Sequence, residues 1–135
     1  MNTILLHNNY SVNEKGHFTV CGHDTVSLAE KFGTPLYVID EDKVREMCRT
    51  YKNAASDNFD NFDILYASKA LSFKGMYKIA AEEGMCVDAV SIGEIYTAIS
   101  AGFPKERIYF HGNNKMKEDI EFAVENGVDK PYYMM

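Results

Sequence analysis

A strand, a helix and a glycine recur in that order three times between residues 64 and 127. Apolar strands are predicted at 64–67, 86–90 and 107–110, and each precedes a segment whose apolar residues repeat at helical spacing. The unit is about 20 residues long, which is typical of βα units that build a parallel sheet. The strands are apolar at almost every position, which predicts that helices cover both faces of the sheet. A glycine is expected to end each of the three helices: Gly84, Gly102 and Gly127.

The segment before these repeats predicts three further elements. A short helix should end at Gly33, a strand should follow over 36–39, and Asp40 should cap the next helix. Apolar residues on that helix repeat at the spacing of one buried face: Val44, Met47, Cys48 and Tyr51.

Residues 128–135 have the character of the start of a fourth strand. Three parallel strands cannot close a barrel, and the last of them would leave an apolar edge unpaired. An open doubly wound sheet of this size is the alternative. We expect instead that the 135 residues are a piece of a larger protein.

Composition excludes several classes of function. The net charge is -6, whereas surfaces that bind nucleic acids or anionic membranes concentrate Lys and Arg. No apolar run approaches the ~20 residues of a membrane span, and residues 1–10 do not resemble a signal peptide. The three cysteines are an odd number without paired spacing, which favours reduced thiols in the cytoplasm. The histidines have no metal-ligand spacing, and the glycines form no nucleotide-binding loop.

In βα repeats the functional groups lie at the carboxyl ends of the strands. Lys69 directly follows the first apolar strand, where partial desolvation would make its amine a better nucleophile for a carbonyl, as a pyridoxal cofactor requires. The alternative is a lysine that extends from the strand end into solvent.

Two other strand ends carry candidate groups. Asp88 lies inside an apolar strand, so it should be a charge partner of Lys69 or form a hydrogen bond with a loop backbone. His111 could act as an acid, a base or a ring-stacking group, or be a hydrogen-bonded histidine at a strand end. Ser91 and Glu94 have the spacing of a capping box, which explains Glu94 without a catalytic role.

Taken in order, these segments resemble the diaminopimelate decarboxylase family, which belongs to the fold-type III pyridoxal phosphate decarboxylases with an alanine-racemase-like barrel. The resemblance extends from about residue 18 to about residue 128. It depends on a lead-in and three strand-end segments: 28–38, Tyr66-Ala67-Ser68-Lys69-Ala70, 87–94 and 110–115.

The resemblance implies an α/β fold in which an incomplete (β/α)8 TIM-type barrel, of about three βα units, follows the N-terminal segment of a β-domain. The boundaries would be 1–40 for the β-domain segment and 41–135 for the pyridoxal-phosphate-binding barrel. Lys69 would be the catalytic Schiff-base lysine, and Asp88 and His111 would bind the cofactor with it; Glu94 would have a supporting role. No metal is implied.

The implied reaction is decarboxylation of meso-diaminopimelate to lysine and CO2. The full-length family would act as a homodimer on a small amino-acid substrate. The ring-stacking histidine, the phosphate loop and the remaining site groups of the family lie beyond these residues, so the chain alone is expected to be inactive. Alternatives are a decarboxylase of the ornithine or arginine type, or a non-catalytic pyridoxal-phosphate-binding or interaction module.

Overall fold

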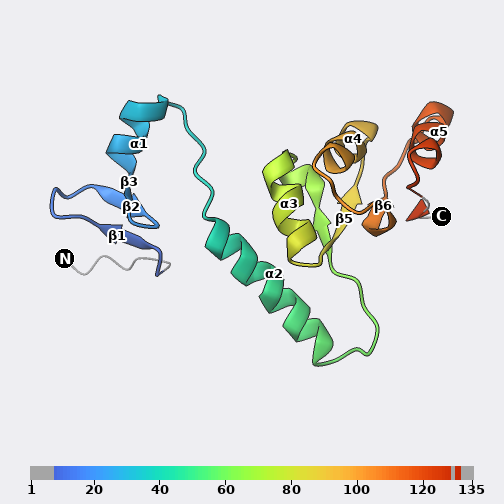
Figure 1. Ribbon diagram of the computed structural model, residues 1–135, viewed down its shortest axis with the longest axis horizontal. Coiled ribbons are helices and arrows are strands. Elements are labelled where there is room, and N and C mark those ends of the chain that lie inside the picture. The colour runs from blue at the N-terminus through green and yellow to red at the C-terminus, as the bar shows by residue number, and fades with distance from the viewer. Residues whose placement is uncertain (1–7, 129, 132–135) are drawn as a thin grey trace. The chain divides into compact units, whose positions relative to one another are not determined.

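The computed structural model describes residues 8–128, 130 and 131 (Figure 1). The chain forms two compact units, Met1–Glu41 and Asp42–Met135. Each unit contains one sheet, three-stranded in the first and four-stranded in the second. Among the described residues, no helix combines the length and the apolar character needed to cross a membrane.

The first unit is a small antiparallel sheet followed by one helix. Its strands pair in sequence order: β1 Tyr10–Val12, β2 Phe18–Val20 and β3 His23–Asp24. Asp24 caps helix α1 (Thr25–Phe32), because its carboxylate accepts a hydrogen bond from the Val26 amide at 2.9 Å. The helix ends at Gly33, where φ is 81°, so the short helix and its terminal glycine are confirmed.

The predicted strand over 36–39 is wrong. The four residues have no regular secondary structure, and their side chains are exposed, Tyr37 by 91%. β-branched and aromatic residues favour a strand only when a neighbouring strand and a packed surface are present. Among the described residues no strand pairs with this segment.

The second unit alternates strands and helices (Figure 1). Its helices are α2 Glu41–Ser56, α3 Lys74–Glu82, α4 Ile92–Ser100 and α5 Lys117–Glu125, with short 3-10 turns at Ser68–Ala70 and Lys105–Arg107. Its strands are β4 Leu65–Ala67, β5 Cys86–Ala89, β6 Ile108–Phe110 and β7 Lys130–Pro131.

All four strands are parallel and lie in sequence order, which confirms the α/β class and the βα repeat. The fourth strand is present as β7, which pairs with β6; the rest of the predicted segment, 129 and 132–135, lies outside the described residues. Gly84, Gly102 and Gly127 follow the three helices with φ of 70–80°, a conformation that suits glycine.

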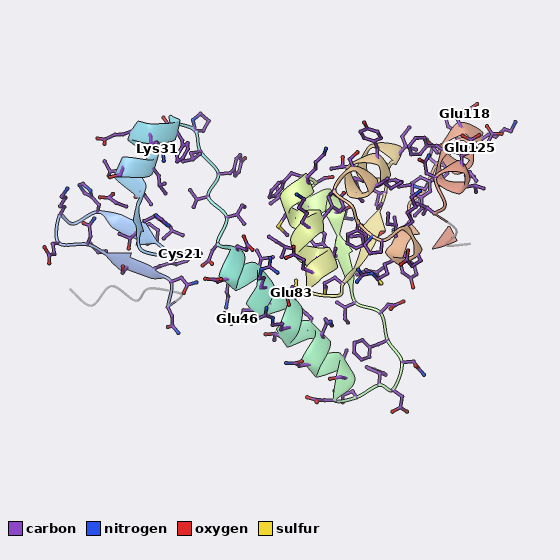
Figure 2. All side chains as sticks on the ribbon, in the orientation of Figure 1. Cys21, Lys31, Glu46, Glu83, Glu118 and Glu125 are labelled. Carbon is purple, nitrogen blue, oxygen red and sulfur yellow. The ribbon has the colours of Figure 1, made fainter. Side chains whose placement is uncertain are left out.

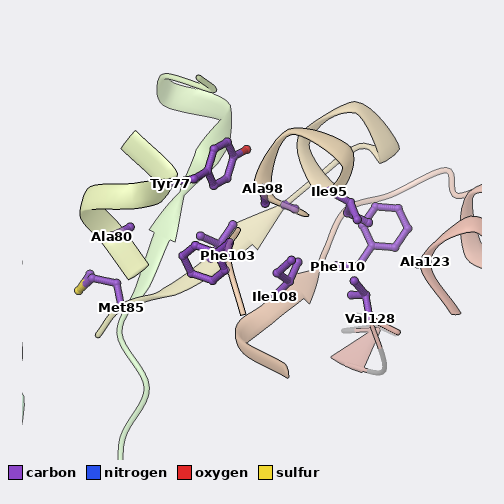
Figure 3. Packing of buried hydrophobic residues seen from close by; sticks show 12 residues of the cluster. Tyr77, Ala80, Met85, Ile95, Ala98, Phe103, Ile108, Phe110, Ala123 and Val128 are labelled. Atoms are coloured by element: carbon purple, nitrogen blue, oxygen red, sulfur yellow. The ribbon is translucent and has the colours of Figure 1, made fainter. Parts of the chain in front are cut away.

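The hydrophobic core lies between one face of this sheet and the helices (Figure 3). Tyr77 of α3, Ile95 of α4 and Ile108 of β6 are fully buried in it. On the other face, Asp88 is only partly buried and Leu65 is 37% exposed. The expectation that helices cover both faces is therefore wrong for the described residues, because successive strand residues alternate between faces and these helices pack on one of them.

The predicted buried face of α2 is also wrong in part. Cys48 packs against the core, but Met47 is 37% exposed and Tyr51 is 61% exposed. The helix is held instead by charge: Arg45 and Arg49 both bind the Glu83 carboxylate, at 3.1 and 2.7 Å (Glu83 is labelled in Figure 2). These hydrogen bonds, led by the one from Arg49, lower the Glu83 pKa to about 2.

Candidate functional site

The carboxyl ends of β4, β5 and β6 meet at one edge of the sheet. Ala67 lies beside Asp88, and Asp88 lies beside Tyr109. The chain leaves β4 through the turn Ser68–Ala70, so Lys69 follows the strand end two residues after the position that pairs with Asp88. The segments at 68–69, 88–91 and 111–115 are thus neighbours, as parallel strand ends must be.

Lys69 lies in the middle of that turn, and its side chain is exposed. The expected partial desolvation is therefore not found, because the turn carries the side chain beyond the strand end. No hydrogen bond or ion pair joins Lys69 to Asp88 or His111 among the described residues. The amine at this edge is accessible to a small carbonyl compound.

Asp88 and His111 face each other across β5 and β6. The Nδ1 atom of His111 lies 3.5 Å from Oδ1 of Asp88. That Oδ1 atom is buried and has no hydrogen-bond partner. A buried carboxylate oxygen without a hydrogen-bond partner is costly, so it is suited to accept a hydrogen bond from a polar ligand group at this edge.

Glu94 connects the strand ends beneath Lys69. Its Oε2 atom accepts hydrogen bonds from the Val90 amide at 2.9 Å and from the Ser68 hydroxyl at 2.5 Å. Ser68 is completely buried, and its hydroxyl is also 2.8 Å from the Asp88 carbonyl oxygen. The carboxylate of α4 therefore fixes the residue that precedes Lys69.

The capping-box prediction is correct in one half only. Ser91 caps α4, since its hydroxyl accepts a hydrogen bond from the Glu94 amide at 3.3 Å. The Glu94 carboxylate, however, binds Val90 and Ser68 rather than the Ser91 amide. An acidic residue at N3 accounts for a helix start, but sequence alone does not show that its carboxylate reaches across to another strand.

Lys115 also lies at this edge. Its ammonium group donates to the carbonyl oxygens of Val90 and His111, at 2.9 and 2.7 Å. The sequence indicated the segment 111–115 but gave Lys115 no role. The only available signal was a lysine that directly follows a turn of glycine and asparagine residues.

A parallel α/β sheet with an accessible lysine and a carboxylate–histidine pair at its carboxyl edge is the arrangement expected of a pyridoxal-binding domain. The comparison with known proteins agrees with this class. Residues 41–134 match the family described as "Pyridoxal-dependent decarboxylase, pyridoxal binding domain". The chain belongs to this family.

The most informative relatives are diaminopimelate decarboxylases. The chain is 48% identical over 122 residues to the enzyme of Bacillus methanolicus, covering 90% of this chain and 28% of the relative. It is 46% identical over 125 residues to that of Bacillus subtilis, covering 93% and 28%. A crystal structure of diaminopimelate decarboxylase from M. jannaschii in complex with L-lysine superposes with a TM-score of 0.76 at 33% identity, covering 90% of this chain and 29% of that one.

These matches confirm the resemblance predicted from the sequence. The chain spans 28% of the length of the two Bacillus relatives. The cofactor of the family is pyridoxal phosphate. The residues present fit its aldehyde end, since an accessible amine and a buried, unpartnered carboxylate oxygen lie at the same sheet edge.

Proposed function

We propose that this chain contributes the cofactor lysine, Lys69, to a pyridoxal-phosphate-dependent decarboxylase that acts on meso-diaminopimelate. One observation carries the proposal: Lys69 is accessible at the carboxyl edge of the parallel sheet, two residues after Ala67, the strand position that pairs with Asp88. Ligands of α/β proteins bind at this edge.

When bound, pyridoxal phosphate supplies an aldehyde for an amine and a ring that accepts the electron pair left by CO2. The role of Lys69 is to bind that aldehyde through Nζ. The role of Ser68 is to orient the turn that carries Lys69, since its hydroxyl donates to the Glu94 carboxylate and lies 2.8 Å from the Asp88 carbonyl oxygen.

The role of Asp88 and His111 is to contact the bound ligand at the same edge. With Oδ1 and Nδ1 3.5 Å apart, the pair can present a carboxylate oxygen and a ring nitrogen together to the polar groups of a bound ligand. The Oδ1 atom supports this role, because it is buried without a hydrogen-bond partner and a donor group of the ligand would supply one.

The finer features of the proposal come from the relatives. The names of the Bacillus enzymes and the L-lysine complex of the M. jannaschii protein support diaminopimelate as the substrate and lysine as the product. A lysine/ornithine decarboxylase from Vibrio vulnificus, 29% identical with a TM-score of 0.69, keeps decarboxylation of another basic amino acid as the second candidate.

We also propose that residues 1–40 belong to a β-domain and residues 41–135 to a (β/α)8 barrel. The sequential, all-parallel order of β4 to β7 supports the barrel. A homodimer in the cytoplasm completes the proposal. The odd number of cysteines without paired spacing supports that compartment.

The experiment is a titration with pyridoxal phosphate, followed by the absorbance band of the imine that an amine forms with it. Lys69→Met should abolish the saturable part of the signal. Lys74→Met is the matched control, because Lys74 is also exposed and begins the next helix; it should bind like the unsubstituted chain. Equal binding by the two variants would contradict the proposal and favour the non-catalytic interaction module.

A further inference from the structure

We infer that Lys115 is a positioning residue of the candidate site. Its ammonium group ties the end of β5 to the end of β6 and thereby sets the distance between Asp88 and His111. Its effect on the reaction rests on the proposed function, whereas its effect on the geometry of the pair does not.

The contacts of Lys115 are the first argument. Its Nζ atom donates to the Val90 carbonyl oxygen at 2.9 Å and to the His111 carbonyl oxygen at 2.7 Å. The same atom lies 3.7 Å from the centroid of the Phe110 ring, as a cation–π contact. An ammonium group has three N–H donors, and Nζ has three contacts, so we assign Lys115 a positioning role rather than that of a nucleophile.

The position of these carbonyl groups is the second argument. The backbone ladder between β5 and β6 extends to the hydrogen bond from the His111 amide to the Ala89 carbonyl, at 2.9 Å. Lys115 adds a cross-link one step further, between Val90 and His111. Val90 lies two residues after Asp88, so this cross-link lies next to both members of the pair.

The backbone of the connecting loop is the third argument. Gly112 has a φ of +128°, and Asn114 has a φ of +57°. A Cβ atom at position 112 would lie 3.1 Å from Nζ of Lys115 and 3.7 Å from the Val90 carbonyl oxygen. Glycine therefore occupies the position in the loop where a Cβ atom would come too close to the ammonium group of Lys115.

Lys115 is partly buried, and charged groups surround its amine. Burial lowers the pKa of its amine, while the nearby carboxylates of Asp119, Glu94 and Asp88 raise it. Two of these carboxylates, Glu94 and Asp88, belong to the candidate site. Lys115 therefore also supplies positive charge to an edge that carries two acidic groups.

The test measures the coupling between Asp88 and His111 in the 135-residue chain by NMR of the His111 ring, without cofactor. In the unsubstituted chain, Asp88→Asn should shift the ring resonances of His111. When Asp88→Asn is introduced into the Lys115→Met variant, the His111 resonances should shift by at most a third of that amount. In the Lys115→Arg variant, Asp88→Asn should produce most of the original shift. Lys117→Met is the control, since Lys117 lies on α5, is 81% exposed and pairs only with Glu121 in the described part of the chain; it should respond like the unsubstituted chain.

An undiminished response in folded Lys115→Met would overturn the inference. Where circular dichroism shows that Lys115→Met does not fold, the comparison uses Lys115→Gln, which keeps a polar group at the site. Loss of the fold in both variants would make Lys115 a stability residue and would also overturn the inference. Failure of Lys69 to bind pyridoxal phosphate leaves this result unaffected, so the two proposals fail separately.

Discussion

Replacing Ser68 by alanine tests whether the hydrogen bonds of Ser68, the residue before Lys69, stabilise the fold. Ser68 is completely buried, and its hydroxyl lies 2.5 Å from Glu94 Oε2 and 2.8 Å from the Asp88 carbonyl oxygen. Alanine has nearly the same volume, so no large cavity forms and the loss is one of hydrogen bonding.

The expected magnitude follows from the charge of the acceptor. A hydrogen bond to a charged group contributes about 1.5–3 kcal/mol, against about 0.5–1.5 kcal/mol for a neutral pair. Glu94 keeps its bond to the Val90 amide in the variant, which limits the cost. We expect Ser68→Ala to lower the free energy of unfolding by about 2 kcal/mol.

The assay is urea denaturation followed by far-ultraviolet circular dichroism at pH 7. Ser72→Ala is the matched control, because Ser72 is exposed and its hydroxyl lies 2.8 Å from the neutral Tyr77 hydroxyl; it should cost about 0.5 kcal/mol. Equal losses in the two variants would refute the reasoning, since the hydrogen bond of buried Ser68 to a carboxylate would then contribute no more than a partly buried bond between two neutral hydroxyl groups.

Three further perturbations address other parts of the structure. Glu83→Gln should lower the free energy of unfolding by about 1–2 kcal/mol at pH 7, because Glu83 is bound by two arginines, one of them 64% exposed. Since the pKa of Glu83 falls from 4.5 to about 2, this stabilisation is present above pH 4.5 and is lost as the pH falls toward 2; urea titrations across that range should show the variant and the unsubstituted chain converging. Gly112→Ala should cost about 1–3 kcal/mol in the same assay through its φ of +128°, whereas Gly93→Ala on α4, where the nearest atom to a new Cβ is 3.8 Å away, should not destabilise; equal effects would contradict the strain argument. Cys21, which is exposed, should react with iodoacetamide faster than Cys48, because burial raises the pKa of the Cys48 thiol; peptide mapping measures both rates, and a faster Cys48 would contradict this order.

The βα repeat was predictable because three local signals agree along the chain. Apolar strands, helical spacing and terminal glycines all give the same boundaries, and β5, α4 and β6 lie where they predict. Parallel order then brings the strand ends together without further information, which is why the segments that carry Lys69, Asp88 and His111 could be expected at one edge of the sheet.

The errors share one physical cause, which is that the sequence does not show what packs against a segment. Residues 36–39 have strand-forming side chains but no pairing strand among the described residues. The apolar face of α2 is exposed at Met47 and Tyr51, because charged side chains determine how this helix is held. The reach of Glu94 to Ser68 and of Lys115 to Val90 depends on side-chain direction across 25 or more residues of sequence.

The central claim is that Lys69 is the amine that binds pyridoxal phosphate. The most direct measurement is borohydride reduction of the chain with pyridoxal phosphate, followed by mass-spectrometric mapping of the modified lysines. The structure predicts that the label concentrates on Lys69 and that Lys115, whose ammonium is held by two carbonyl groups, remains unmodified. A label spread evenly over the exposed lysines, with no excess at Lys69, would contradict the claim.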